Sequence, residues 1–146
     1  MESTLFEAPE YDPAMERRRR NRIIAIVAAV VVLAVLAFLF RNWPYTRVAD
    51  HFFAAIEQKQ FEKAYGIWRA DPDWQKHPDK HKNYPFNEFY VDWGPSSEWG
   101  TITSHKVLGA VRNGSGVIVE VRLNGRAEPA RIWVDRSDKT ITFSPF

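Results

Sequence analysis

An unbroken apolar stretch from Ile23 to Phe40 constrains this chain more than any other feature. It contains no charged or polar side chain, no Gly and no Pro. A bilayer core of about 30 Å takes roughly 20 apolar residues to cross as a helix. A buried helix in a small soluble domain, by contrast, shows polar residues at helical spacing. The stretch therefore predicts a transmembrane helix over residues 23–40.

The charges on either side of this stretch favour one orientation in the membrane. Five arginines come just before it, namely Arg17, Arg18, Arg19, Arg20 and Arg22, whereas Arg41 alone follows it directly. Positive charge gathers on the cytoplasmic side of membrane proteins. We therefore expect residues 1–22 to form a disordered cytoplasmic tail with a basic run beside the membrane, and residues 41–146 to be extracytoplasmic. Trp43 and Tyr45 then lie at the level of an interfacial aromatic belt.

The residues before the apolar stretch also predict where its helix starts. Residues 1–11 are acidic and show no periodicity, as in disordered segments. Asp12 is the expected N-cap and Pro13 the first helical residue. The apolar stretch is longer than the core of a cleaved signal peptide, and no small residues follow it at a cleavage position. We therefore expect a retained anchor, with a bacterial inner membrane as the preferred location.

Composition argues against several classes of function. Cysteine is absent, which excludes disulfides, thiolate catalysis and cysteine metal sites. The formal net charge is +2, and there is no basic face with interleaved aromatic residues of the kind that binds nucleic acid. No Gly-rich phosphate loop is present. We expect neither a nucleic-acid partner nor a bound cofactor.

Residues 41–146 predict one domain that begins with helices. We expect Pro44 to end the membrane helix and Thr46 to cap the next one. Apolar residues then recur at helical spacing on both sides of a polar break at residues 58–60: Val48, Ala49, Phe52, Phe53, Ala55 and Ile56, then Phe61, Ala64, Tyr65 and Trp68. This pattern predicts two short helices, or one bent helix, with a buried face.

The second half of the domain predicts a sheet. Residues 71–100 are rich in Pro and aromatic residues, and a short helix is expected over residues 87–93. From residue 101 the apolar period changes to two, which is typical of half-buried strands. We expect four strands, joined by short turns as an antiparallel meander, over residues 101–112, 117–124, 131–135 and 140–144. Short helices packed on a curved four-stranded antiparallel sheet make an α+β fold.

In this order of elements, residues 44–146 resemble a small nuclear-transport-factor-2-like domain, the cone shape also found in SnoaL-like proteins. The layout is similar to the periplasmic part of bitopic assembly factors in bacterial type IV secretion systems. A cystatin-like domain shares the helix-on-meander arrangement and is the alternative fold. The resemblance rests on element order, without a residue motif. It implies a pocket between helix and sheet, in which some enzymes of the group use an Asp/His acid–base pair.

Three residues are candidates for lining such a pocket. Asp50 and His51 fall on the first predicted helix of the domain, and His105 falls on the first predicted strand. A catalytic pair needs hydrogen-bond reach and a shifted pKa. The alternative is that Asp50 and His51 lie on the polar side of an amphipathic helix. We therefore name these residues as ligand-binding candidates and predict no catalytic residue.

A second histidine pair has the spacing of a metal site. His77 and His81 stand four residues apart, which allows two histidines to share a zinc ion if the segment is helical. Pro78 and the neighbouring lysines favour a solvated basic loop instead. We predict no metal site there.

The segment DWGPSSEWG, residues 92–100, is the most distinctive in the chain. Trp93 and Trp99 of this segment, together with Tyr90 just before it, are candidate contact residues for a partner protein, because exposed Trp and Tyr side chains dominate binding energy at interfaces. The alternative is that the two tryptophans are buried and close one end of the core. Gly94 and Gly100 are expected to supply left-handed backbone for a constrained turn.

These features favour a non-enzymatic function. We expect a single-pass membrane protein whose domain serves as a scaffold, assembly or accessory subunit of a membrane complex. Its expected partners are the lipid bilayer and other membrane or envelope proteins, with a homodimer as an alternative. The competing hypothesis is a small-ligand-binding or enzymatic domain with a pocket between helix and sheet. A third is a regulatory factor that signals through its tail.

Overall fold

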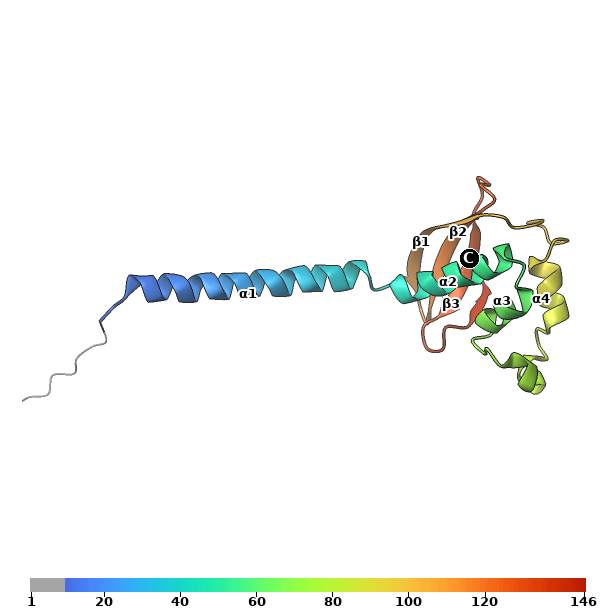
Figure 1. The fold of residues 1–146 in the computed structure, drawn as a ribbon, viewed down its shortest axis with the longest axis horizontal. Helices are drawn as coiled ribbons and strands as arrows, with labels where there is room; N and C mark the ends of the chain where they lie inside the picture. The colour runs from blue at the N-terminus through green and yellow to red at the C-terminus, as the bar shows by residue number, and fades with distance from the viewer. Residues whose placement is uncertain (1–9) are drawn as a thin grey trace, which may run out of the picture. The chain divides into compact units, whose positions relative to one another are not determined.

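The computed structural model describes residues 10–146, and the chain divides into two compact units between Arg41 and Asn42. The elements follow in the order α1 (Pro13–Leu39), α2 (Trp43–Glu57), α3 (Phe61–Trp68), the 3₁₀ helices η1 (Trp74–Lys76) and η2 (Pro78–His81), α4 (Phe86–Trp93), β1 (His105–Asn113), β2 (Gly116–Leu123), β3 (Ala130–Asp135) and β4 (Ile141–Phe143). Figure 1 shows the long helix of the first unit and the helices and sheet of the second. The expected α+β layout is confirmed.

Helix α1 starts where the sequence predicts. Asp12 is its N-cap, and its Oδ1 accepts a hydrogen bond of 2.9 Å from the backbone N–H of Ala14, while Pro13 is the first helical residue. The helix has 27 residues, a length of about 40 Å, and includes the basic run. None of its side chains is buried. By length and composition α1 could cross a membrane. Disorder was predicted for the whole tail, residues 1–22, but residues 13–22 are helical and belong to α1, while residues 1–9 lie outside the described residues.

The start of α2 differs from the prediction. We expected Pro44 to end the membrane helix and Thr46 to cap the next one. The structure instead ends α1 at Leu39 and starts α2 at Trp43, with Asn42 as its N-cap residue and Pro44 in its first turn. Pro is tolerated there because that N–H has no helical partner to lose. Thr46 lies inside the helix and donates its hydroxyl hydrogen to the Trp43 carbonyl at 3.0 Å.

The N-cap residue of α2 also bonds to the first strand of the sheet. The Asn42 side-chain amide donates a hydrogen bond to the Ala110 carbonyl at 3.3 Å and accepts one from Arg112 Nε at 2.9 Å. Both partners belong to β1, which forms one edge of the sheet. The first residue of the second unit is therefore bonded to the helix and to the sheet edge.

The four strands form an antiparallel meander in the order β1-β2-β3-β4, as the alternation predicts. The register of β1 against β2 shifts between Val107 and Gly109, so that Leu108 sits at a bulge. The first strand starts four residues later than expected, at His105. The preceding segment is held by Asn124, whose side-chain oxygen accepts a hydrogen bond of 2.8 Å from the Thr103 N–H.

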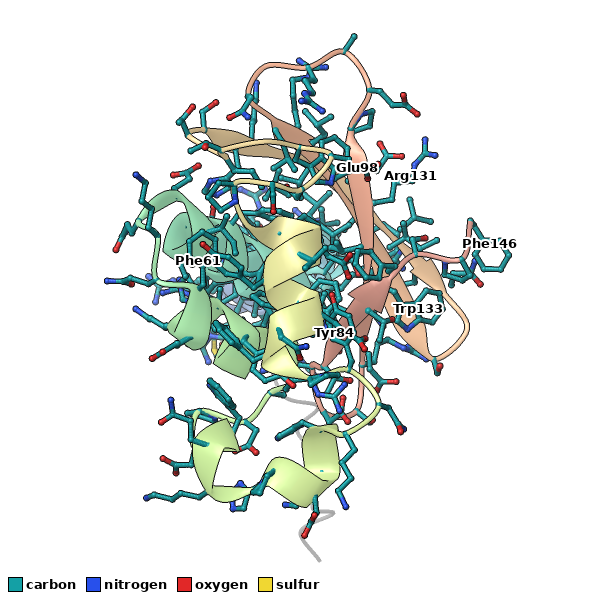
Figure 2. All side chains as sticks on the ribbon, turned by 90° about the vertical axis from the view of Figure 1, so that its right-hand side faces the viewer. Phe61, Tyr84, Glu98, Arg131, Trp133 and Phe146 are labelled. Carbon is teal, nitrogen blue, oxygen red and sulfur yellow. The ribbon has the colours of Figure 1, made fainter. Side chains whose placement is uncertain are left out.

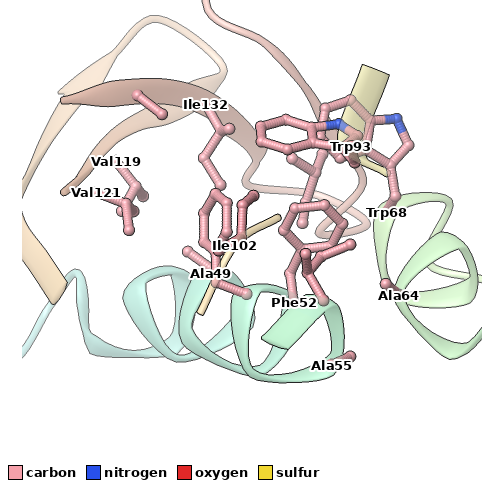
Figure 3. Packing of buried hydrophobic residues seen from close by; sticks show 14 of the residues in the cluster. Ala49, Phe52, Ala55, Ala64, Trp68, Trp93, Ile102, Val119, Val121 and Ile132 are labelled. Atoms are coloured by element: carbon pink, nitrogen blue, oxygen red, sulfur yellow. The ribbon is translucent and has the colours of Figure 1, made fainter. Parts of the chain in front are cut away.

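Aromatic side chains fill the space between the helices and the inner face of the sheet (Figure 3). Phe52 of α2 lies at the centre of this core. Its ring centroid is 4.9 Å from that of Phe53, 5.3 Å from Trp68, 6.0 Å from Phe89 and 5.4 Å from Trp93. Most of these pairs meet edge to face, the arrangement that ring quadrupoles favour. The predicted apolar faces of α2 and α3 are confirmed as buried.

The segment from Trp74 to Trp93 folds over this core. Tyr65 donates its hydroxyl hydrogen to the Tyr84 carbonyl at 2.6 Å, and Tyr84 donates its own to Asp92 Oδ2 at 2.6 Å. Partial burial and the Asp92 hydrogen bond raise the pKa of Tyr84 far above its usual range, so its hydroxyl stays protonated as a donor. The helix expected over residues 87–93 is present as α4.

The outer face of the sheet carries charged side chains. Arg131 Nε donates to Glu120 Oε1 at 2.9 Å across neighbouring strands. Figure 2 shows Arg131 and Trp133 on the side of the sheet away from α4. The period-2 pattern of β2 and β3 therefore separates the core face from the solvent face.

Replacing Phe52 by Ala tests the role of this aromatic core. Loss of the central ring leaves a cavity among four other rings, so we expect the free energy of unfolding to fall by about 3–5 kcal/mol. Urea unfolding of the full chain in detergent micelles, followed by near-UV circular dichroism, measures the change. The matched control is Val91→Ala on α4, where the side chain is 61 % exposed and a change within about 0.5 kcal/mol is expected. Equal losses in both variants would contradict the assignment.

Candidate functional site

Two helical carboxylates and a strand histidine meet on the surface of the domain. Asp50 and Glu57 are seven residues apart on α2, which places them two turns apart on one side of the helix. His105 is the first residue of β1. Its Nε2 lies 2.7 Å from Asp50 Oδ1, and its Nδ1 hydrogen-bonds to Glu57 Oε1. We call Asp50, Glu57 and His105 the carboxylate–histidine cluster.

The cluster lies at the boundary between core and solvent. The His105 side chain is 11 % exposed, that of Glu57 is 25 % exposed and that of Asp50 is 56 % exposed. One side of the His105 ring faces Phe53, with ring centroids 5.9 Å apart. The imidazole is thus enclosed by an aromatic ring and two carboxylates, and only Asp50 extends well into solvent.

Opposing effects set the pKa of His105. Burial is the largest single effect and lowers the pKa of the imidazole, because it disfavours the charged form. Hydrogen bonds to Glu57 and Asp50, together with their negative charges, act in the opposite direction and outweigh burial. The net result is a pKa raised above the ordinary value of 6.5. Both ring nitrogens face carboxylate oxygens, which favours an imidazolium that donates from each nitrogen.

This geometry is suited to holding α2 on β1 rather than to acid–base catalysis. A general base needs a free ring nitrogen within reach of a substrate proton. In His105 both nitrogens are occupied by the chain's own carboxylates. The structure thus brings together two of the three predicted ligand-binding residues, Asp50 and His105. His51 is exposed one residue further along α2 and belongs to none of these hydrogen bonds.

Glu57 is the member of the cluster that sequence reasoning missed. Its spacing of seven residues from Asp50 was a usable signal, because two helical turns return to the same side of a helix. The polar break that begins at residue 58 made Glu57 look like the end of a helix facing solvent. Nothing in the local pattern showed that a strand histidine 48 residues away would lie beside it.

An open hollow of about 450 Å³ adjoins the cluster. It is lined by Trp43, Thr46, Arg47, Asp50 and His51 from α2, and by Val107, Leu108 and Gly109 from β1. Asp50 and His51 therefore both line this hollow, whereas His105 does not. The hollow is lined by α2 and β1, and the aromatic core fills the space between the helices and the sheet.

A second polar cluster joins α3 to the 3₁₀ helices. Asp71 Oδ2 lies within hydrogen-bond distance of two histidines, 2.8 Å from His81 Nε2 and 2.9 Å from His77 Nδ1. Arg69 Nε donates a hydrogen bond to His81 Nδ1 at 2.9 Å. Because Arg can only donate, the Nδ1 of His81 must be unprotonated and its Nε2 carries the hydrogen. His81 is 7 % exposed. Hydrogen bonds from His81 first, and then from His77, outweigh desolvation and lower the pKa of Asp71.

These contacts explain the histidine spacing without a metal. The pair lies in and beside a 3₁₀ helix, and both rings point to the same carboxylate oxygen. The Arg69 guanidinium beside His81 opposes a further cation by charge repulsion. Within residues 10–146, no three His, Cys, Asp or Glu side chains are arranged to hold a metal ion.

The predicted contact residues divide between core and surface. Trp93 is 2 % exposed and packs in the aromatic core, so it cannot act as a surface contact. Tyr90 is 41 % exposed and Trp99 is half-buried under Arg126, whose guanidinium carbon lies 5.4 Å from its ring centroid. The alternative, in which both tryptophans are buried, therefore holds for Trp93 and not for Trp99.

The two glycines of this segment serve different purposes. Gly100 has a φ of +65°, the left-handed backbone that was expected. The expectation is wrong for Gly94, whose φ is −78°. An added Cβ at Gly94 would lie 2.4 Å from the Tyr90 carbonyl oxygen. Close approach of the chain to the end of α4 therefore explains the glycine at position 94.

The stability of the domain should depend on the protonation of His105. A raised pKa means that the cluster stabilises the fold fully below the ordinary histidine pKa of 6.5. This contribution is lost as pH rises through the higher pKa of the folded state. In urea titrations from pH 5 to 9, we expect His105→Gln to lower the free energy of unfolding most at low pH and least at high pH. His51→Gln is the control, and its effect on the free energy of unfolding should not shrink as pH rises. A loss of stability in His105→Gln that is the same at every pH would contradict this account.

The Asp71 cluster should show the opposite dependence. Its lowered pKa gives a contribution that is present above the ordinary value of 3.8 and is lost as pH falls through the lower folded-state value. We expect Asp71→Asn to destabilise the fold at neutral pH and to reduce the steepness of acid unfolding. Acid titration followed by tryptophan fluorescence measures both. Asp79→Asn is the control, because this residue lies on the same segment with a side chain that is 87 % exposed. It should leave the acid unfolding transition unchanged.

Comparisons with known proteins do not identify a family for this chain. No protein-family model matches the chain, and no curated protein or solved structure matches it. The resemblance to nuclear-transport-factor-2-like domains accordingly stays a prediction.

Proposed function

We propose that this chain is a single-pass membrane protein whose second unit, Asn42–Phe146, is an extracytoplasmic scaffold or accessory subunit of a membrane complex.

The observation that carries the proposal is the apolar surface of α1. The helix has 27 residues, and none of its side chains is buried by the rest of the chain. An apolar surface of this size is unfavourable in water and marks a membrane or protein contact. A helix of this length and composition matches a bilayer core. The arginines at its start favour a cytoplasmic N-terminus.

A binding role is favoured over catalysis by how the domain uses its polar groups. The space where a cone-shaped enzyme would hold its substrate is filled with aromatic side chains. His105 and His81, the two most enclosed histidines of the clusters described above, are both bonded through both ring nitrogens. These groups hold elements of the fold together. The surface is then the part of the domain left to carry function.

The contact surface that we propose lies along α3 and α4. Tyr90 packs edge to face on Phe61, with centroids 5.0 Å apart, and lies 6.2 Å from Phe86. Val91 beside it is 61 % exposed. Exposed Tyr side chains supported by neighbouring rings are typical anchors of protein interfaces. Figure 2 shows Phe61 at the side of α4 opposite to Trp133. The partner would be another membrane or envelope protein.

One feature favours the alternative of a small ligand. A mainly apolar hollow of about 580 Å³ lies outside α3, with Ile67, Pro72, Trp74 and Lys139 among its lining residues. Its size is in the range of small-molecule sites. None of the predicted ligand-binding residues lines it. A nuclear-transport-factor-2-like origin of the domain would be compatible with either role.

Thiol labelling tests the orientation directly. The chain has no cysteine, so single-cysteine variants report one site each. We expect Glu128→Cys to react with a membrane-impermeant maleimide in intact cells, and Glu10→Cys to react only after the membrane is permeabilised. Both positions are exposed. The reverse pattern would overturn the orientation, and labelling of both without permeabilisation would overturn the span.

Site-specific crosslinking tests the binding role in the same membranes. A benzophenone amino acid replaces Tyr90, and Arg122 on the outer face of the sheet is the matched control position. We expect a discrete adduct with another membrane or envelope protein from position 90 and none from position 122. An adduct of two identical chains would indicate a homodimer. No adduct from position 90 would contradict the proposed surface and favour the small-ligand alternative.

A further inference from the structure

Two large apolar side chains are exposed beside each other at the hollow between α2 and β1. Trp43 is 51 % exposed and Leu108 is 39 % exposed, and both line this hollow. Leu108 sits at the register shift of β1, and such bulges turn a side chain away from the regular alternation of a strand. Arg47 also lines this hollow. We call Trp43, Arg47 and Leu108 the basic–aromatic surface.

Arg47 is the basic residue of this surface. Its guanidinium carbon lies 4.9 Å from the Trp43 ring centroid. The acidic residue of the hollow, Asp50, is hydrogen-bonded to His105 at 2.7 Å. An anionic partner would therefore find a guanidinium beside exposed apolar groups.

The length of the connection limits where this surface can be. Residues 40–42 alone separate the end of α1 at Leu39 from the start of α2 at Trp43. Four residue steps span at most about 14 Å even when fully extended. The headgroup region on each side of a bilayer is about 5–8 Å thick. If α1 crosses the membrane, Trp43 must lie in or directly above the headgroup layer.

We propose that the basic–aromatic surface docks on the phospholipid headgroup layer of the membrane that α1 crosses, with Trp43 and Leu108 at the lipid–water boundary and Arg47 at the phosphates. This inference rests on the proposed membrane span. Indole rings favour the interface because they combine an apolar body with a polar N–H. Arg pairs with phosphate in a bidentate geometry. The short connection favours a bilayer over a peptide, because it delivers this surface to the headgroups.

Nitroxide depth measurements test the docking in the full chain. A spin label is attached to Leu108→Cys, and the protein is reconstituted in nanodiscs of phosphatidylcholine and phosphatidylglycerol, whose two faces are both open. Collisions with a water-soluble nickel chelate and with oxygen, which concentrates in lipid, report depth. We expect the label at position 108 to lose most of its nickel accessibility on transfer from detergent to nanodiscs. A label at His51→Cys, on the other wall of the hollow, gives an independent measurement.

Two further labels separate this inference from the proposed span. Glu128→Cys, an exposed position outside the proposed contact surface, is the aqueous control, and Leu33→Cys, in the apolar stretch of α1, reports the span. A label at position 33 that is shielded from nickel, with positions 108 and 51 as accessible as position 128, would overturn the docking and leave the span intact. Nickel access at position 33 would overturn the span itself.

A charge variant tests the assignment of Arg47. In the labelled Leu108→Cys chain, we expect Arg47→Gln to restore nickel access at position 108, because the contact with lipid phosphate is lost. Arg122→Gln removes the same charge from the outer face of the sheet and should change nothing. Equal effects of the two substitutions would overturn the role of Arg47, since they would indicate a general dependence on net charge.

Discussion

The packing of α2 against the sheet is the contact on which the rest of the domain depends. Phe52 and Phe53 are neighbours in sequence, and both are fully buried. Through them the helix meets the rings of α3, α4 and the inner face of the sheet. Because this apolar contact fixes the orientation of α2, it also fixes the position of the polar side of the helix. Asp50 and Glu57 on that side therefore lie beside β1, where both are hydrogen-bonded to His105.

The two polar clusters serve the same purpose at different places. Each joins segments at the border of the aromatic core: β1 to α2 in one case, and the 3₁₀ helices to the end of α3 in the other. In each, an imidazole is satisfied at both nitrogens, which avoids the cost of an unpaired buried polar group. Arg beside His81 and carboxylates beside His105 select opposite protonation states for the two rings.

Sequence periodicity predicted what depends on local structure. The buried faces of α2 and α3 and the alternation of β2 follow from side-chain spacing alone, and the structure confirms them. The sequence could not predict that α2 is capped by Asn42 in place of Thr46. Pro44 is compatible with a helix start at either residue, and the hydrogen bond from Asn42 to the Ala110 carbonyl at the edge of the sheet favours the earlier start. Asp50 and His105 were named as candidates for one pocket, but the hydrogen bonds of His105 to Glu57 and Asp50 join residues 48 or more positions apart, which local spacing does not show. Trp93 and Tyr90 are alike in local pattern and differ in burial through tertiary packing.

The double role of Asn42 affects how the domain would carry mechanical load. Tension transmitted along the chain from α1 enters the folded unit at this residue, whose side chain bonds to Ala110 and Arg112 of β1. The load is therefore divided between the backbone of α2 and the edge of the sheet. Opening the domain from this end would require breaking hydrogen bonds on two elements together, so the first turn of α2 is protected against being unwound residue by residue.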